Sequence, residues 1–115
     1  MKRGEVYWTD LAPRSGSEQR GRRPVIVLSN DVFNRAPIWK STIVVPLSTS
    51  PSQAARGPSV VNIPAGAGGL SRASMAVCHQ VTTLDRGKLG RRIGTLAPGL
   101  LREVEEALKT AMDLS

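Results

Sequence analysis

The sequence is poor in the side chains from which metal centres and nucleophilic sites are usually built. Its 115 residues include one cysteine, Cys78, and one histidine, His79. A lone cysteine excludes an intrachain disulfide framework and favours a reducing compartment such as the cytoplasm. The few carboxylates outside the C-terminal segment are not paired at ligand spacing, although a metal-dependent hydrolase needs such a cluster. We therefore expect no metal site and no cofactor.

Long apolar runs and phosphate-binding glycine motifs are missing as well. No apolar run approaches membrane-spanning length, and the N-terminus has no secretory apolar core. The glycine-rich stretch at residues 65–69 is not followed by the helix that a Walker or dinucleotide motif requires. The sequence thus predicts a soluble, cytoplasmic protein that does not associate with a membrane.

Arginine and lysine, by contrast, are abundant. With 16 basic and 9 acidic residues, the formal net charge is +7. Many of these basic residues gather in two segments, residues 14–23 and 86–92. Such an uneven basic surface is typical of a protein that binds a polyanion, and nucleic acid is a better candidate than a membrane surface.

Short β-branched segments separated by turn residues predict a small, strongly bent antiparallel sheet or partial barrel. We expect strands over residues 5–10, 25–29, 42–47, 60–63, 74–81 and 92–95, and polar loops over residues 12–21 and 48–57. Neither a repeat nor a linker divides the chain, so residues 1–115 form one domain.

Only the C-terminal segment has a helical pattern. Pro98 suits the first helical position, and Leu100, Val104 and Leu108 recur with a spacing of four residues. We expect Glu105 and Lys109 to pair one turn apart on the outer face of this helix. We therefore expect the carboxylates of this helix to be surface charges.

The segment from residue 16 to residue 34 carries the strongest functional signal. Pro24 cannot donate a hydrogen bond to a sheet, so we expect it to be the first residue of the second strand. Arg23 would then be held at the start of a strand, beside a polar loop. A guanidinium fixed in this way is suited to binding an oxyanion such as a phosphate.

An arginine-centred site can cleave RNA through the RNA's own 2′-hydroxyl. That reaction needs charge stabilisation on the phosphorane, a proton acceptor and a proton donor. Arg23 can stabilise the charge, and Glu18 and His79 are the available bases. Ser48 or Thr49 can hydrogen-bond a phosphate oxygen or the attacking hydroxyl. A hydroxyl-rich loop and a lone histidine are more often structural, so each residue alone is weak support.

These residues lie in motifs whose order and spacing resemble those of the MazF/PemK (Kid) toxins of bacterial toxin–antitoxin modules. The resemblance covers nearly the whole chain and ends with the C-terminal helix. Its motifs are Arg3-Gly4-Glu5-Val6-Tyr7-Trp8, Gly16-Ser17-Glu18-Gln19, Arg23-Pro24-Val25, Asn30, Asn34, Val45-Pro46-Leu47, His79-Gln80 and Ile93-Gly94.

The resemblance implies a mainly β fold with an α-helix, an SH3-like small barrel of the MazF/Kid/CcdB type. It implies a homodimer and a sequence-specific, metal-independent endoribonuclease that cuts single-stranded RNA. The products would be a 2′,3′-cyclic phosphate and a 5′-hydroxyl. It also implies neutralisation by a cognate MazE-like antitoxin, whose acidic, apolar tail would occupy the RNA groove.

The family's site residues transfer unevenly. The essential arginine corresponds to Arg23 and the loop glutamate to Glu18. Relatives usually have threonine at the position of Ser48, so either Ser48 or Thr49 can take that role. His79 stands where relatives are typically acidic, and Val77 stands where Kid-type members have arginine, so the Kid-type acid–base pair is not carried over. The residues assigned to RNA binding are Arg14, Gln19, Arg20, Arg22, Asn34 and Gln80.

Two other functions are compatible with such a fold. A CcdB-like toxin poisons gyrase and relies on a Trp-Gly-Ile C-terminus, whereas this chain ends in Met-Asp-Leu-Ser. A non-catalytic RNA-binding barrel usually stacks bases on surface aromatic residues, and this chain has few of them. The endoribonuclease is therefore the favoured interpretation.

Overall fold

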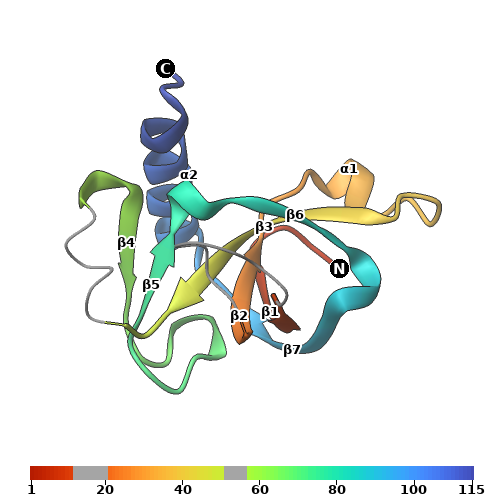
Figure 1. Ribbon diagram of the computed structural model, residues 1–115, viewed down its shortest axis with the longest axis horizontal. Coiled ribbons are helices and arrows are strands. Elements are labelled where there is room, and N and C mark those ends of the chain that lie inside the picture. The colour runs from red at the N-terminus through yellow and green to blue at the C-terminus, as the bar shows by residue number, and fades with distance from the viewer. Residues whose placement is uncertain (12–20, 51–56) are drawn as a thin grey trace.

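The β-branched segments form one antiparallel sheet, to which a C-terminal helix is added (Figure 1). The structure, a computed structural model, describes residues 1–11, 21–50 and 57–115. Its strands are β1 (Glu5–Asp10), β2 (Arg22–Val27), β3 (Ser41–Ser48), β4 (Val60–Ile63), β5 (Ser74–Val77), β6 (Thr82–Asp85) and β7 (Leu89–Thr95). Its helices are α1 (Asp31–Asn34) and α2 (Pro98–Met112), with short 3-10 turns at η2 (Ala67–Gly69), η3 (Cys78–Gln80) and η4 (Arg86–Lys88).

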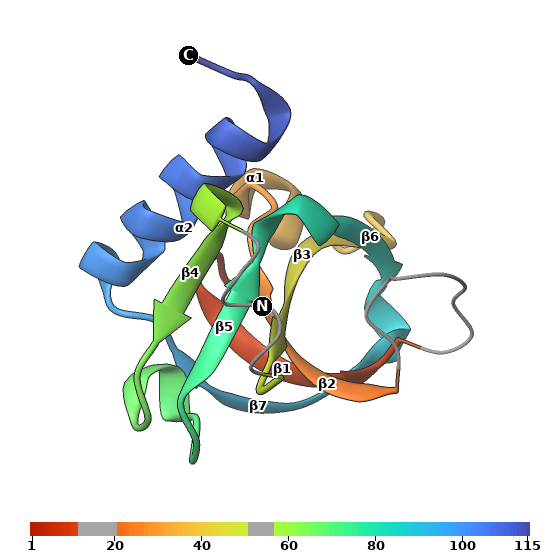
Figure 2. The same ribbon diagram turned by 60° about the vertical axis from the view of Figure 1, so that its left-hand side comes forward.

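The strands are hydrogen-bonded in the order β4-β5-β3-β2-β1-β7, and β6 pairs with β3 off this path. One end of β3 pairs with β6, and its other end, at Leu47 and Ser48, pairs with β5. The sheet curves strongly (Figure 2), but β4 and β7 remain at its two ends. The predicted fold class, mainly β with a C-terminal helix, is confirmed, and the barrel is not closed in the described part of the chain.

Aliphatic side chains from the strands and from α2 fill the interior. Val104 of α2 is completely buried, and the Sγ of Cys78 donates to the Val104 carbonyl oxygen at 3.7 Å. Burial raises the pKa of the Cys78 thiol to about 12. The largest buried core residues are Ile26, Leu47, Ile63, Val6, Val25, Val27, Val44, Val45, Val77 and Val104. α2 therefore holds one end of the sheet through the η3 turn and β4.

Several element boundaries follow the sequence prediction, and others do not. The strands predicted over residues 5–10 and 60–63 are β1 and β4, and Pro98 does begin α2. The strand predicted over residues 74–81 is wrong in its second half, because the chain turns at Cys78 into η3. The strand β6 and the short helix α1 were not expected. The loop predicted over residues 12–21 lies largely outside the described residues.

The start of β2 also differs from the prediction. The strand begins at Arg22, so Pro24 is its third residue and pairs with Trp8 of β1. On the other side, β3 pairs with β2 only from Val25 onward. The first residues of β2 therefore lie at a sheet edge on that side, where a proline is tolerated. Arg23 lies within the strand instead of before it.

The ion pairs of α2 differ from the expected Glu105–Lys109 pair. Glu105 binds Arg3 at 2.6 Å, and Lys109 lies 3.5 Å from Glu106. Arg3 comes from the N-terminal segment, and its backbone N–H donates to Asp31 at 2.8 Å. A tertiary partner thus replaces a local one, and Glu105 links the helix to the N-terminus.

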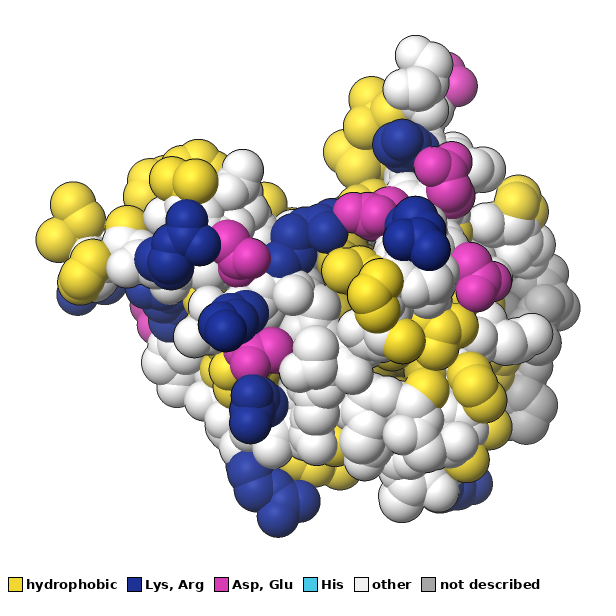
Figure 3. Space-filling model, turned by 180° about the vertical axis from the view of Figure 1, so that it is seen from behind, with side chains coloured by type: hydrophobic (Ala, Val, Ile, Leu, Met, Phe, Trp, Pro, Cys, Tyr) yellow, Lys and Arg dark blue, Asp and Glu magenta, His cyan; other side chains and the backbone are white. Residues whose placement is uncertain are grey.

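An exposed apolar cluster lies at the end of the molecule formed by α1 and the α1–β3 connection (Figure 3). Phe33 and Trp39 stack with their ring centroids 4.6 Å apart, and Ile38 is 85% exposed. Arg86 holds this connection in place, because its guanidinium donates to the carbonyl oxygens of Phe33, Asn34 and Ala36. The cluster is therefore a fixed apolar surface.

Candidate active site

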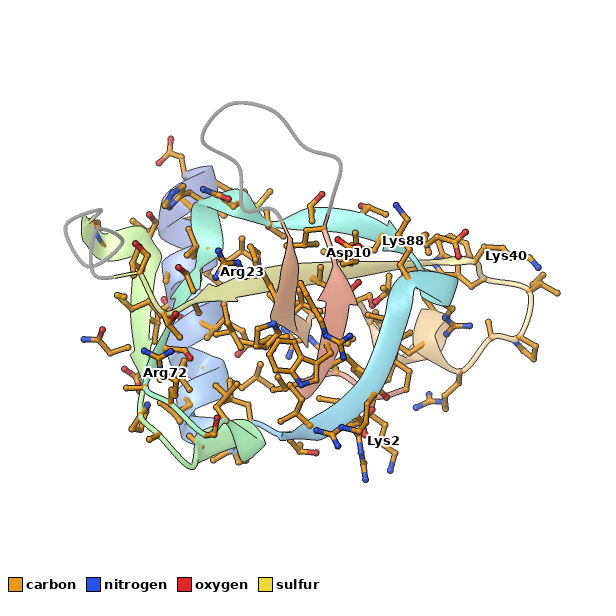
Figure 4. The ribbon with its side chains drawn as sticks, turned by 60° about the horizontal axis from the view of Figure 1, so that its bottom comes forward. Lys2, Asp10, Arg23, Lys40, Arg72 and Lys88 are labelled. Carbon is orange, nitrogen blue, oxygen red and sulfur yellow. The ribbon has the colours of Figure 1, made fainter. Side chains whose placement is uncertain are left out.

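A cavity of about 320 Å³ lies where β1, β2, β3, β7 and the η2–β5 connection meet. Its polar wall contains four arginines and the hydroxyl of Thr49, and none of its described lining residues is a carboxylate. These arginines are Arg22, Arg23, Arg72 and Arg91. The apolar part is formed by Trp8, Pro24, Leu47, Leu70 and Ile93. Figure 4 shows Arg23 and Arg72 in the same half of the molecule, away from Lys40.

The pairing of β1 with β2 determines where Arg22 and Arg23 lie. Arg23 lies opposite Thr9 and is partly buried, because it is inside the strand. The guanidinium carbon of Arg22 lies 5.4 Å from the centroid of the Trp8 ring, which is the geometry of a cation–π contact. Arg23 is therefore held on a strand, as its second residue, whereas the sequence predicted a place directly before the strand.

Of the two candidate hydroxyl residues, only Thr49 lines this cavity. Thr49 follows the end of β3 and is exposed. Ser48 was expected in a loop, but it is the last residue of β3 and only 2% exposed. The Ser48 Oγ accepts a hydrogen bond from the Ser50 backbone N–H at 3.1 Å. Ser48 thus stabilises the turn after β3, and Thr49 is the one of the two that lines the cavity with the arginines.

His79 lies on η3 and is not among the residues that line the cavity. Its ring is exposed, and its Nδ1 lies 2.8 Å from the Oγ of Ser59. Gln80 follows it on the same turn and is partly exposed. Both residues belong to η3 because the chain leaves the predicted strand at Cys78.

Asn34 does not fit its assignment to RNA binding. It is 5% exposed, and its amide donates to the Ser29 carbonyl at 2.8 Å and to Asp31 at 3.0 Å. Its side-chain oxygen accepts from the Ser29 hydroxyl at 2.7 Å. These buried hydrogen bonds fix the turn between β2 and α1, so we assign Asn34 a structural role. Four other candidates lie outside the described residues: Arg14, Glu18, Gln19 and Arg20.

Two of the cavity's arginines were not selected from the sequence. Arg72 follows the glycine-rich turn, and Arg91 belonged to the second basic segment without a specific role. On β7, Arg91 faces the cavity, while its neighbour Arg92 binds Glu5 at 2.8 Å. Alternation along a strand separates the two arginines. The sequence shows that arginines are clustered in this segment. Which of them face the cavity depends on how β7 pairs with β1, which the sequence does not show.

Glycines bring the Arg72 segment against β7. Gly69 has φ +78°, and a Cβ at this position would lie 2.2 Å from the Ile93 carbonyl oxygen. A Cβ at Gly94 would lie 2.6 Å from the Gly68 carbonyl oxygen. The two backbones can approach this closely only because both residues lack a side chain. This contact positions Leu70 and Arg72 at the wall of the cavity.

Glu5 forms a separate, structural network beneath β7. It is 6% exposed, and its carboxylate accepts hydrogen bonds from the Lys2 N–H, the Tyr7 hydroxyl and Arg92. Burial alone would raise the pKa of Glu5, but these donors outweigh it and lower the pKa below its usual 4.5. Burial and the nearby Glu5 carboxylate raise the pKa of Tyr7.

No group of three or more histidine, cysteine, aspartate or glutamate side chains is placed to hold a metal ion within the described residues. Neither of the helices in the same residues is long and apolar enough to cross a bilayer.

Comparison with known proteins identifies the family. A sequence model of the PemK-like, MazF-like toxins of type II toxin–antitoxin systems matches residues 2–112. The chain belongs to this family. Its MazF-like relatives include endoribonuclease EndoA of Bacillus subtilis, 39% identical over 99% of this chain and 96% of the relative. Endoribonuclease MazF6 of Mycobacterium tuberculosis is 34% identical over 99% and 98%, respectively.

Solved MazF structures have the same architecture. MazF from Deinococcus radiodurans superposes with a TM-score of 0.80 at 25% identity, covering 99% of this chain and 97% of that one. A mycobacterial endoribonuclease in complex with its cognate antitoxin gives a TM-score of 0.77 at 26% identity, covering 98% and 95%. The MazF-like fold therefore extends over the whole described chain.

Proposed function

We propose that this chain is the toxin of a type II toxin–antitoxin pair and acts as a sequence-specific, metal-independent endoribonuclease on single-stranded RNA. The observation that carries the proposal is the cavity in which Arg23 and Thr49 meet, lined by arginines and, in the described residues, by no carboxylate. The named endoribonucleases among its relatives support the same activity.

In the proposed reaction, the 2′-oxygen of the substrate attacks the adjacent phosphorus. The bond from phosphorus to the 2′-oxygen forms, and the bond to the 5′-oxygen of the next nucleotide breaks. The products are a 2′,3′-cyclic phosphate and a 5′-hydroxyl. Arg23 donates hydrogen bonds to the non-bridging phosphoryl oxygens, where negative charge develops. Its place on a strand supports this role, because a preorganised donor is not reoriented during the reaction.

The general base takes the 2′-hydroxyl proton, and a general acid protonates the leaving 5′-oxygen. Glu18 and His79 are the two candidate bases. His79 is not among the described residues that line the cavity, and Glu18 lies outside the described residues, so both stay candidates. Thr49, rather than the buried Ser48, is proposed to hydrogen-bond the phosphate or the attacking hydroxyl.

The remaining RNA contacts are proposed from the charge pattern and the family resemblance. Arg22 lines the cavity, and Arg14, Gln19, Arg20 and Gln80 are proposed as further RNA-binding residues. A basic groove of this kind also attracts an acidic peptide. We therefore assign the cognate MazE-like antitoxin to the same groove.

The proposed assembly is a homodimer in the cytoplasm, the compartment that the single cysteine favours. The apolar cluster of Phe33, Ile38 and Trp39 supports a second copy of the chain as partner. An exposed apolar surface held rigidly by Arg86 is costly to leave in water.

The direct test is to incubate the purified chain with single-stranded RNA in EDTA and to sequence the 5′-hydroxyl ends. We expect one short recognition sequence and undiminished cleavage. Arg23→Ala should lower kcat by roughly a hundredfold or more, equivalent to about 3 kcal/mol of transition-state stabilisation. Arg102→Ala, which removes an exposed arginine on α2, is the matched control. A folded Arg23→Ala that cuts within about threefold of wild type, or activity restored only by magnesium, would contradict the proposal.

A further inference from the structure

The arginines of the cavity differ from the structural arginines of the fold in how their charge is compensated. Arg3 and Arg92 are paired with carboxylates, and Arg86 is hydrogen-bonded to backbone carbonyls. Three arginines line the same cavity and have no carboxylate partner among the described residues: Arg22, Arg72 and Arg91. Converging cations of this kind create a positive potential that an anionic ligand relieves.

The rest of the lining shows that the ligand is not a bare anion. Trp8, Leu47 and Ile93 form an apolar part beside the guanidinium groups. Flat bases stack on aromatic and arginine side chains, and this contact is tolerant of sequence. A phosphate ion does not contact the apolar part of the cavity, and an acidic side chain has no flat apolar group that could stack on Trp8.

The volume limits the size of the occupant. At about 320 Å³ the cavity is at the small end of ligand sites, so it holds one unit of a chain. Its wall is preformed, because the close contact of Gly69 with Ile93 fixes the segment that carries Arg72. The ligand therefore enters an existing site and does not have to assemble it.

We propose that this cavity is a mononucleotide subsite that holds one phosphate and its base next to the cleaved bond, with Arg72 and Arg91 as its affinity-determining residues. The inference rests on the proposed function, because Arg23 and Thr49 line the same cavity. Arg23 acts on the reacting phosphate, and Arg72 and Arg91 hold the neighbouring nucleotide in position. Arg22 lies over the Trp8 ring, and the base is proposed to stack where Trp8 lines the cavity.

Intrinsic tryptophan fluorescence tests the subsite without any cleavage. The probe is 2′-deoxyadenosine 5′-monophosphate, which has no 2′-hydroxyl. We expect a saturable change in emission that disappears in Trp8→Phe, which retains Trp39. Deoxyadenosine and inorganic phosphate should each bind about tenfold more weakly or worse, because each lacks half of the contacts. Inorganic phosphate that binds as tightly as the nucleotide, or a nucleotide signal that persists in Trp8→Phe, would overturn the proposal.

Arginine variants then separate the subsite from the reaction. Arg72→Ala and Arg91→Ala should each weaken nucleotide binding about tenfold, and raise the KM for RNA by a similar factor with kcat nearly unchanged. Arg102→Ala should change neither quantity, and circular dichroism checks that each variant is folded. A folded Arg72→Ala that binds the nucleotide as tightly as wild type would overturn the assignment.

The two proposals fail in distinguishable ways. Wild-type protein that cleaves RNA but shows no nucleotide binding at Trp8 would disprove the subsite and leave the endoribonuclease intact. Protein that binds the nucleotide but cleaves no RNA would disprove the proposed reaction while the cavity remains a nucleotide site.

Discussion

Replacing Glu5 with glutamine is expected to destabilise the fold at neutral pH and to remove part of its acid sensitivity. The carboxylate is nearly buried and accepts hydrogen bonds from the Lys2 N–H at 2.6 Å and the Tyr7 hydroxyl at 2.9 Å. Glutamine has almost the same shape, but its amide oxygen is neutral and its amide nitrogen would face the Arg92 guanidinium, donor against donor.

The magnitude follows from these contacts. A hydrogen bond to a charged group contributes roughly 1.5–3 kcal/mol and a neutral one about 1 kcal/mol. Neutralising the acceptor of two such bonds should therefore lower the free energy of unfolding by about 1–4 kcal/mol. The exposed guanidinium of Arg92 adds little, because water screens it.

The pH dependence has a definite sign. The pKa of Glu5 in the folded protein lies below the ordinary 4.5, so its stabilising effect is complete above that value. This contribution is lost as the pH falls through the folded pKa. Glutamine does not titrate, so the stability gap between wild type and Glu5→Gln should close in acid.

Urea unfolding followed by circular dichroism measures this gap at neutral pH and at a series of values below 4.5. Glu103→Gln, which alters an exposed carboxylate on α2, is the control and should stay within about 0.5 kcal/mol of wild type. A Glu5→Gln protein as stable as wild type at neutral pH would refute this account of the network. So would a gap that stays constant through the acid range.

Three further changes test other parts of the molecule. Gly94→Ala should lower the free energy of unfolding by about 2 kcal/mol or more, because its Cβ would lie 2.6 Å from the Gly68 carbonyl oxygen. Thermal melts measure this loss. Gly99→Ala, whose Cβ would have open space around it, is the control and should not destabilise the fold. Trp39→Ser should shift light scattering at micromolar concentration toward a monomer, and an unchanged mass would place the contact between copies elsewhere. His79→Ala should leave the rate and the cut site intact if Glu18 is the base. A folded His79→Ala that loses most of the cleavage rate would instead assign the base to His79.

The predictable part of the fold is the part decided by local chemistry. Most residues of β1 and β4 are β-branched or aromatic, and Pro98 with its following apolar spacing specifies α2. The turn at Cys78 could not be read in the same way, because Ala-Val-Cys-His-Gln-Val continues an apolar pattern. The chain turns there because η3 must pack beneath α2, a contact between distant parts of the sequence.

The candidate site shows the same division. Arg23 was a candidate from the sequence, because Pro24 placed it near the start of a strand and it lies in a motif that resembles the family's. Ser48 and Thr49 are adjacent hydroxyl residues, and only the exact end of β3 decides which of them is buried. Arg72 was not recognisable, because its position depends on the backbone contact between Gly69 and β7. Asn34 matched a family motif, but the motif reflects a buried turn.

The buried thiol of Cys78 can report local opening of the fold at the contact between α2 and η3. A thiol reagent reacts with the thiolate, and a pKa of about 12 leaves almost none of it at neutral pH in the closed fold. Because the Sγ is covered by the Val104 backbone of α2, modification requires α2 to separate from η3. No other cysteine competes for the reagent. The rate at which Cys78 is labelled in native buffer therefore measures how often α2 separates from η3.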